Sequence, residues 1–153
     1  MLRKIFRFFL KIFLWFIVLS VFSVVLFRFV PVPFTPLMII RSVQQKSDGK
    51  DMKLLHDWVP LEEISPELQK AVIASEDGKF FTHHGFDFDA IAKAYKDNQK
   101  GKKVKGGSTI SQQVAKNVFL WNGRNYIRKG LEAYFTVLIE LLWDKERIME
   151  VCL

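Results

Sequence analysis

Cysteine and histidine are scarce in this 153-residue chain, and their scarcity excludes two classes of protein. Cys152 is the only cysteine, so no disulfide can form within the chain. His83 and His84 are adjacent, and neither a cysteine nor the third histidine lies near them in the sequence, which argues against a zinc site. Half of the residues are apolar and a quarter are charged, which excludes a disordered or collagen-like chain.

Acidic residues are missing from residues 1–30. That stretch carries five basic residues, Arg3, Lys4, Arg7, Lys11 and Arg28. Without them, residues 31–153 hold 18 basic and 16 acidic residues, so most of the formal charge of +7 lies near the N-terminus. A nearly neutral remainder gives little electrostatic support to nucleic-acid binding, and we expect no nucleic-acid partner.

Residues 8–30 form a long hydrophobic run. Only four of these residues are not apolar, namely Lys11, Ser20, Ser23 and Arg28. As a helix, the run is roughly 35 Å long, enough to cross a bilayer core of about 30 Å. A cleaved signal peptide is the alternative, but its apolar core would be shorter and followed by small residues. We therefore expect residues 1–30 to be an uncleaved anchor, with the preceding basic residues in the cytoplasm and the rest of the chain outside.

The remainder of the chain divides into a linker and a mainly α-helical domain. Three prolines stiffen the start of the linker, residues 31–57, and residues 37–59 show no clean period, which predicts short extended pieces. Within the domain, residues 58–153, capping residues and helical spacing predict helices over 65–78, 87–98, from 108, 125–143 and from 144. The residues expected to face inward are Ile110, Val114 and Val118, then Ile127, Leu131, Tyr134, Phe135, Leu138 and Leu142.

Glu76 is the first candidate for chemistry. It closes an apolar helix just before Gly78, Phe80 and Phe81. A carboxylate beside aromatic residues is a candidate for desolvation, and desolvation makes a carboxylate a usable base. An exposed acid at a helix end is the alternative interpretation of the same pattern.

Two further polar patterns favour an anionic or sugar ligand. Gly106-Gly107-Ser108-Thr109 opens a helix whose free N–H groups would attract anions, although the spacing is not that of a Walker loop. Thr109, Gln113 and Lys116 then share a helix face that suits a phosphorylated or sugar ligand, or else a solvated surface. Arg128, Lys129 and Glu132 cluster at helical spacing, as a binding group or as an ordinary surface ion pair.

Four stretches, taken in order, resemble the motifs of the peptidoglycan glycosyltransferases, glycosyltransferase family 51. They are Glu76-Asp77-x-x-Phe80-x-x-His83-x-Gly85, Gly106-Gly107-Ser108-Thr109-Ile110-Ser111-Gln112-Gln113-x-x-Lys116-Asn117, Arg128-Lys129-x-x-Glu132 and Lys145-x-x-Ile148-x-Glu150. The resemblance covers residues 58–153 and is strongest to the monofunctional biosynthetic branch. It implies a mostly helical, lysozyme-like glycosyltransferase domain behind the transmembrane helix, in the bacterial cytoplasmic (inner) membrane.

The resemblance also implies a reaction and residue roles. A growing lipid-linked glycan strand is transferred to lipid II with inversion, releasing undecaprenyl pyrophosphate. Glu76 matches the catalytic base, and Glu132 matches a second glutamate that assists departure of the pyrophosphate. The implied substrate-binding residues are Ser108, Thr109, Gln112, Gln113, Lys116, Asn117, Arg124, Arg128 and Lys129, and the implied positioning residues are Asp77, Phe80 and His83.

The implied partners are lipid II, the lipid-linked strand, the membrane and other cell-wall synthesis proteins. No cofactor is required, although a divalent cation, Mg or Mn, is an option at the pyrophosphate.

The chain departs from the family pattern at its last residues. Family members usually have tyrosine where Cys152 stands, then asparagine and several more helices. We therefore expect an incomplete version of the domain. Two alternatives to the transferase stay open: a lysozyme-like lytic glycosidase, which would also use two carboxylates, and an inactive membrane-anchored fragment.

Overall fold

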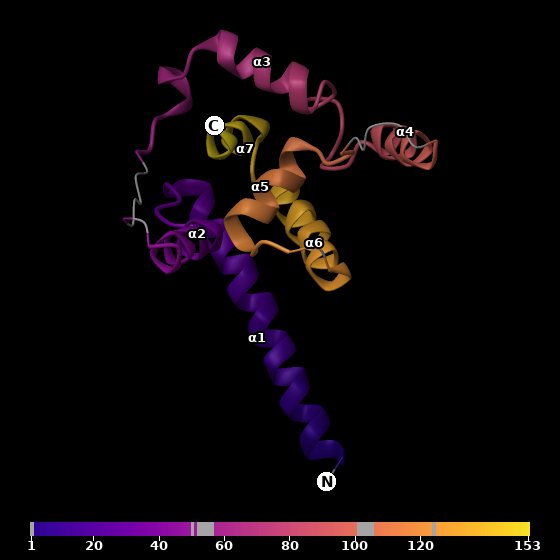
Figure 1. The fold of residues 1–153 in the computed structure, drawn as a ribbon. Helices are drawn as coiled ribbons and strands as arrows, with labels where there is room; N and C mark the ends of the chain where they lie inside the picture. The colour runs from indigo at the N-terminus through magenta and orange to yellow at the C-terminus, as the bar shows by residue number, and fades with distance from the viewer. Residues whose placement is uncertain (1, 50, 52–56, 101–105, 124) are drawn as a thin grey trace.

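A computed structural model describes residues 2–49, 51, 57–100, 106–123 and 125–153, and the regular elements in these segments are all helical (Figure 1). This confirms the mainly α class. In chain order the elements are α1 (Leu2–Phe29), α2 (Pro36–Ser47), the short 3₁₀ helix η1 (Leu61–Glu63), α3 (Pro66–Glu76), α4 (Phe88–Gln99), α5 (Ile110–Phe119), α6 (Tyr126–Leu142) and α7 (Lys145–Cys152).

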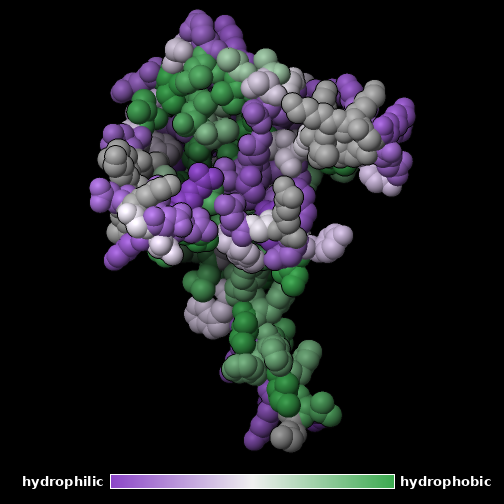
Figure 2. All heavy atoms as spheres, in the orientation of Figure 1, coloured by the Kyte–Doolittle hydropathy of each residue, from purple (hydrophilic) through white to green (hydrophobic). Residues whose placement is uncertain are grey.

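Helix α1 is the one described helix that is long and apolar enough to cross a membrane. Its N-terminal part projects away from the other helices (Figure 1), and hydrophobic residues cover most of the projecting surface (Figure 2). Its C-terminal part is different, because Ser20 and Val24 are buried against the rest of the molecule. The helix is therefore both an apolar rod and a part of the folded core.

Polar contacts fasten the end of α1 to α6 and α7. The Tyr134 hydroxyl lies 2.7 Å from the Ser20 hydroxyl, and it must be the donor because Ser20 already donates to the Ile17 carbonyl. The Trp143 indole N–H donates to the Val24 carbonyl at 2.8 Å. The Arg147 guanidinium donates to carbonyl oxygens at the C-terminus of α1, where helix carbonyls lack partners within the helix.

The expected extended linker is wrong over much of its length, because Pro36–Ser47 is helical. The Thr35 side chain accepts from the Met38 N–H at 3.2 Å, and Pro36 occupies the first turn. This is the same start signal as Ser65-Pro66 at the start of α3. The apolar residues of α2 do not follow a clean period, which is why the spacing gave no helix.

Helix α5 lies at the centre of the domain and packs against α2, α6 and α7 (Figure 1). The predicted stripe of Ile110, Val114 and Val118 is buried, as are Phe135 and Ile139 on α6. The expectation that Ile127 faces inward is wrong, because 76% of this residue is exposed. It lies in the first turn of α6, where the helix extends beyond α5.

The predicted helix starts agree with the caps that the structure contains. Ser65, Thr109, Asn125 and Asp144 each accept a hydrogen bond from a backbone N–H of the following helix. The Asp87 carboxylate likewise accepts from the Ala90 N–H ahead of α4. Helices α3 and α4 lie at the periphery, and neither has a buried residue among those described.

Candidate active site

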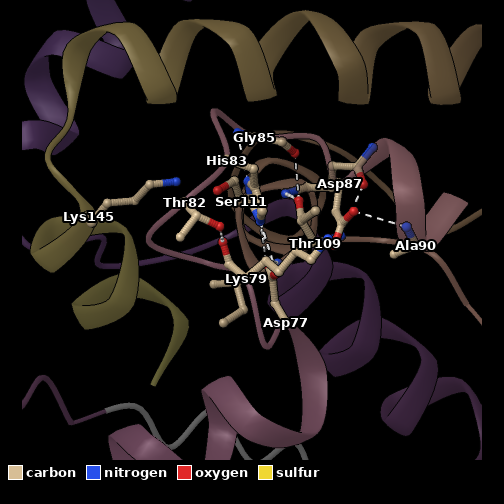
Figure 3. Close-up of polar contacts among 12 residues, drawn as sticks. Asp77, Lys79, Thr82, His83, Gly85, Asp87, Ala90, Thr109, Ser111 and Lys145 are labelled. Atoms are coloured by element: carbon tan, nitrogen blue, oxygen red, sulfur yellow. Dashed lines mark hydrogen bonds and ion pairs between the residues drawn. The ribbon is translucent and has the colours of Figure 1, made fainter.

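The loop between α3 and α4 is fastened to the start of α5 by Asp77 and His83 (Figure 3). Both carboxylate oxygens of the buried Asp77 lie 2.9 Å from His83 Nε2, and Oδ2 also accepts from the Ile110 N–H at 3.0 Å. His83 Nδ1 accepts from the Gly85 N–H at 3.1 Å, so the hydrogen of the neutral ring is on Nε2. The structure thus gives these two residues contacts that hold the loop in place.

Gly85 brings the same loop against α5 and α6. Its φ is +87°, and a Cβ there would lie 2.8 Å from Thr136 Cγ2 and 3.0 Å from Glu140 Cγ. Only glycine accommodates both the backbone conformation and the close approach. The Thr109 hydroxyl donates to the Gly85 carbonyl at 2.7 Å, which joins the loop to the N-cap of α5.

The start of α5 is occupied by the protein's own groups. Thr109 and Gln112 form a capping box, and both are buried. Gln112, which the resemblance implies as a substrate-binding residue, is therefore a buried capping residue and does not lie on a free polar face. The Ile110 N–H, expected to attract an external anion, already donates to Asp77. The polar residues that remain partly accessible on α5 are Gln113, Lys116 and Asn117.

Glu76 is the last residue of α3, and it is exposed. The expected desolvation of its carboxylate is therefore wrong, because α3 lies at the periphery and buries none of its residues. Gln113 Nε2 on α5 orients the carboxylate by donating to Glu76 Oε2 at 2.8 Å. The first predicted catalytic residue is thus linked to α5 by the Gln113 side chain of the second motif.

Glu132 has the opposite environment, since only 3% of its side chain is exposed. Arg128 Nη1 donates to one oxygen at 2.8 Å, and the Lys129 ammonium forms an ion pair with the other. Arg128 Nε is buried and has no hydrogen-bond partner among the residues that the structure describes. Two cations therefore surround one buried carboxylate, leaving a net positive charge. This cluster is not an ordinary surface ion pair.

Whether the optional divalent cation can bind at Glu132 depends on the two oxygens of its carboxylate. Both oxygens are already engaged by Arg128 and Lys129. Within the described segments, no three His, Cys, Asp or Glu residues gather as a metal site requires. A divalent cation at the pyrophosphate therefore stays a prediction.

A cavity of about 300 Å³ joins the second and third motifs. It is lined by Gly107, Ser108, Gln112 and Lys129, with Ile91, Ala94 and Tyr95 of α4 on the other side. A Cβ on Gly107 would lie 3.1 Å from the Ile91 Cα, so this glycine permits the close approach of loop and helix. Glu76 is not part of this lining, and Arg124 lies outside the described residues.

A second buried polar cluster was not predicted as part of the site. The Glu140 side chain on α6 accepts from the Ser111 hydroxyl on α5 and pairs with Lys145, at the start of α7, at 2.7 Å. Lys145 is the first residue of the fourth motif, and this position was the signal in the sequence that could have pointed to the cluster.

The pKa of the Cys152 thiol on α7 depends on the nearby Glu76 carboxylate. Burial raises the pKa of the Cys152 thiol, and the Glu76 carboxylate raises this pKa further. Glu76 therefore lies within electrostatic reach of α7 as well as in contact with α5. A thiol with a raised pKa is a poor nucleophile, so Cys152 is not a candidate catalytic residue.

Comparison with known proteins identifies the family. Residues 44–153 match the transglycosylase family. The chain is 61% identical over 143 residues to the biosynthetic peptidoglycan transglycosylase of Bdellovibrio bacteriovorus, covering 94% of this chain and 57% of that protein. It is 57% identical over 142 residues to the protein of the same name from Caulobacter vibrioides, covering 93% and 59%.

A third relative, the biosynthetic peptidoglycan transglycosylase of Pseudomonas fluorescens (strain SBW25), is 54% identical over 153 residues, covering 100% of this chain and 64% of that protein. The chain thus spans about three fifths of the length of these curated relatives. A family match over most of the chain, and relatives at this level of identity, agree with the four ordered motifs. The chain belongs to the transglycosylase family.

Proposed function

We propose that this chain carries the active site of a peptidoglycan glycosyltransferase, which polymerises lipid II and releases undecaprenyl pyrophosphate. The observation that carries the proposal is the arrangement of two unlike carboxylates around α5. Glu76 is exposed and bound to Gln113 of α5, whereas Glu132 is buried between two cations on α6, which packs against α5. One group is free to accept a proton, and the other organises positive charge.

Each group has a step in an inverting transfer. The Glu76 carboxylate takes the proton from the attacking sugar hydroxyl of lipid II. The oxygen of that hydroxyl bonds to the anomeric carbon of the lipid-linked strand, and the bond from that carbon to the pyrophosphate oxygen breaks. Lys116, Arg128 and Lys129 supply positive charge for the negative charge that develops on the departing diphosphate. Ser108, which is exposed and lines the cavity together with Lys129, contacts the substrate in this proposal.

The proposed place of this reaction is the outer face of the bacterial cytoplasmic membrane. The support is the apolar helix α1 together with the basic residues Arg3, Lys4, Arg7 and Lys11 near its start. A lipid-linked substrate lies in the same bilayer that α1 would span. Other cell-wall synthesis proteins are expected as partners at this surface.

The decisive experiment follows polymerisation of lipid II by the full chain in detergent micelles. Glu76→Gln should lower the rate by about 10²- to 10⁴-fold, because the substituted amide cannot accept the proton. Lys116→Ala should cause a smaller loss, since it removes only part of the charge stabilisation. Glu67→Gln, in the exposed first turn of the same helix, is the matched control and should keep the wild-type rate.

The lytic alternative predicts a different substrate. A glycosidase acting on neutral glycan has no need of the positive charge around Glu132. Cleavage of preformed, lipid-free glycan by the wild-type chain would therefore favour the glycosidase. Polymerisation that persists unchanged in Glu76→Gln would remove Glu76 as the base.

A further inference from the structure

The cluster of Ser111, Glu140 and Lys145 has no step in the proposed reaction, yet it joins three helices at one oxygen atom. Glu140 Oε1 accepts from the Ser111 hydroxyl of α5 and from the Lys145 ammonium at the start of α7. Only 7% of the Glu140 side chain is exposed. A carboxylate buried this deeply is tolerated only when it is paired and hydrogen-bonded, so these contacts are constrained.

The same cluster supports both ends of the segment from Phe80 to Gly85. Lys145 Nζ lies 4.6 Å from the centre of the ring of Phe80, which is completely buried. Figure 3 shows the Lys145 side chain extending toward this loop. At the other end, Gly85 approaches so closely that a Cβ would lie 3.0 Å from Glu140 Cγ. The loop therefore rests on the Glu140–Lys145 pair.

The loop in turn fixes the end of α3. The Phe80 N–H donates to the Asp77 carbonyl at 2.9 Å, and the Asp77 N–H donates to the Ile73 carbonyl at 3.0 Å. The Asp77 side chain is held by the Ile110 N–H. Glu76 directly precedes Asp77, and within the described segments its side chain has one hydrogen bond, to Gln113. The backbone position of Glu76 thus depends on the loop that follows it.

We propose that Glu140 and Lys145 are positioning residues for Glu76. Their ion pair holds Phe80 and Gly85, these hold the loop against α5, and the loop sets where the Glu76 carboxylate meets its substrate. This inference rests on the proposed role of Glu76 as the base. It assigns a role in the reaction to two residues, Glu140 and Lys145, that touch neither the substrate nor Glu76.

The first test measures backbone amide hydrogen exchange in the full chain in detergent micelles. Lys145→Met should speed exchange of the Phe80, Gly85 and Ile110 amides by about tenfold or more, because the loop opens locally. Amides of the buried part of α6 should keep their rates. Lys145→Arg, which retains the charge, should restore slow exchange in the loop. Lys79→Met is the matched control, because it removes an exposed ion pair with Asp89 from the same loop.

The second test asks whether Lys145 acts through Glu76. In lipid II polymerisation, Lys145→Met should lower kcat roughly tenfold to a hundredfold with KM within about twofold. In a Glu76→Gln background, the same substitution should cause no further loss, because there is no base left to position. A merely structural role would lower the rate by an equal factor in both backgrounds.

The outcomes separate the two proposals. Unchanged loop exchange in Lys145→Met, or an equal loss in the Glu76→Gln background, would overturn the positioning role while the glycosyltransferase proposal stands. Faster loop exchange in Lys145→Met, together with a wild-type chain that makes no polymer, would overturn the proposed function, and the contact between Lys145 and the loop would still hold. A tenfold effect confined to the loop and to chains that contain Glu76 supports both.

Discussion

Helices α5 and α6 and helix α3 contribute to the same candidate site but are held in the fold in different ways. Six residues of α5 and four of α6 are buried, and Glu132 is one of them. Helix α3 has no buried residue, and Glu76 is exposed. Hydrophobic packing can therefore fix the cationic cluster, but it cannot fix the proposed base. The base depends on a few polar contacts and on the loop that follows it. The two regions should respond differently to substitution, and this difference can be measured.

The largest difference is expected for apolar side chains. Ile139→Ala on α6 should lower the free energy of unfolding by about 2–5 kcal/mol, because Ile139 is completely buried and its loss leaves a cavity. Leu68→Ala on α3 should cost under about 1 kcal/mol, since half of Leu68 is exposed. Denaturant titration of both variants in detergent micelles checks this. Equal losses would contradict the contrast between the two regions.

A smaller loss is expected where α1 joins the core. Arg147→Ala should lower the free energy of unfolding by about 1.5–3 kcal/mol, because charged hydrogen bonds to the Phe27 and Val30 carbonyls are lost. Arg28→Ala is the control, since Arg28 is exposed at the end of α1 and contacts the ring of Phe29. The same titration measures both. If Arg147→Ala unfolds like wild type, α1 is not fastened to α7 by this side chain.

The N-cap residues of α5 and α3 can be compared directly, because each side chain accepts a hydrogen bond from the first turn of its helix. Thr109→Ala at the start of α5 should cost about 1–2 kcal/mol, because a buried capping box and the bond to Gly85 are lost together. Ser65→Ala at the start of α3 should cost about 0.5–1 kcal/mol, since its cap is exposed. Thermal unfolding of the two variants measures the difference, and a larger loss at Ser65 would reverse the interpretation.

Local signals predicted most of the helices. Capping residues at Ser65, Asn125 and Asp144 set helix starts, and the spacing of Ile110, Val114 and Val118 marked the buried stripe. Helix α2 was missed although Thr35-Pro36 carries the same start signal, because its apolar residues have no clear period. Propensity and periodicity act over a few residues, and they succeed where tertiary packing agrees with them.

The environments of the two glutamates could not be predicted in the same way. The spacing of Arg128, Lys129 and Glu132 fits an exposed cluster as well as a buried one, and only the packing of α6 against α5 decides between them. Glu76 follows an apolar run, but α3 lies at the periphery, so the carboxylate stays exposed. Ser111 and Glu140 meet across 29 positions in the sequence, and no local pattern contains that contact.

The smallest expected effect tests where Glu76 lies. Because burial and the Glu76 carboxylate both raise the pKa of Cys152, less thiolate is present at pH 8 than for a free cysteine. Iodoacetamide should therefore alkylate native Cys152 slowly, and Glu76→Gln should lower this pKa and speed alkylation by about two- to threefold. Since Cys152 is the only cysteine, mass spectrometry of the intact chain gives the rate directly.

Glu67→Gln is the control for this measurement, because it removes a negative charge from the opposite end of α3. It should leave the alkylation rate unchanged if the effect comes from the neighbourhood of Cys152 and Glu76 rather than from net charge. The sign of the change is as informative as its size. An unchanged rate in Glu76→Gln would mean that the Glu76 carboxylate lies too far from α7 to raise the pKa of the Cys152 thiol.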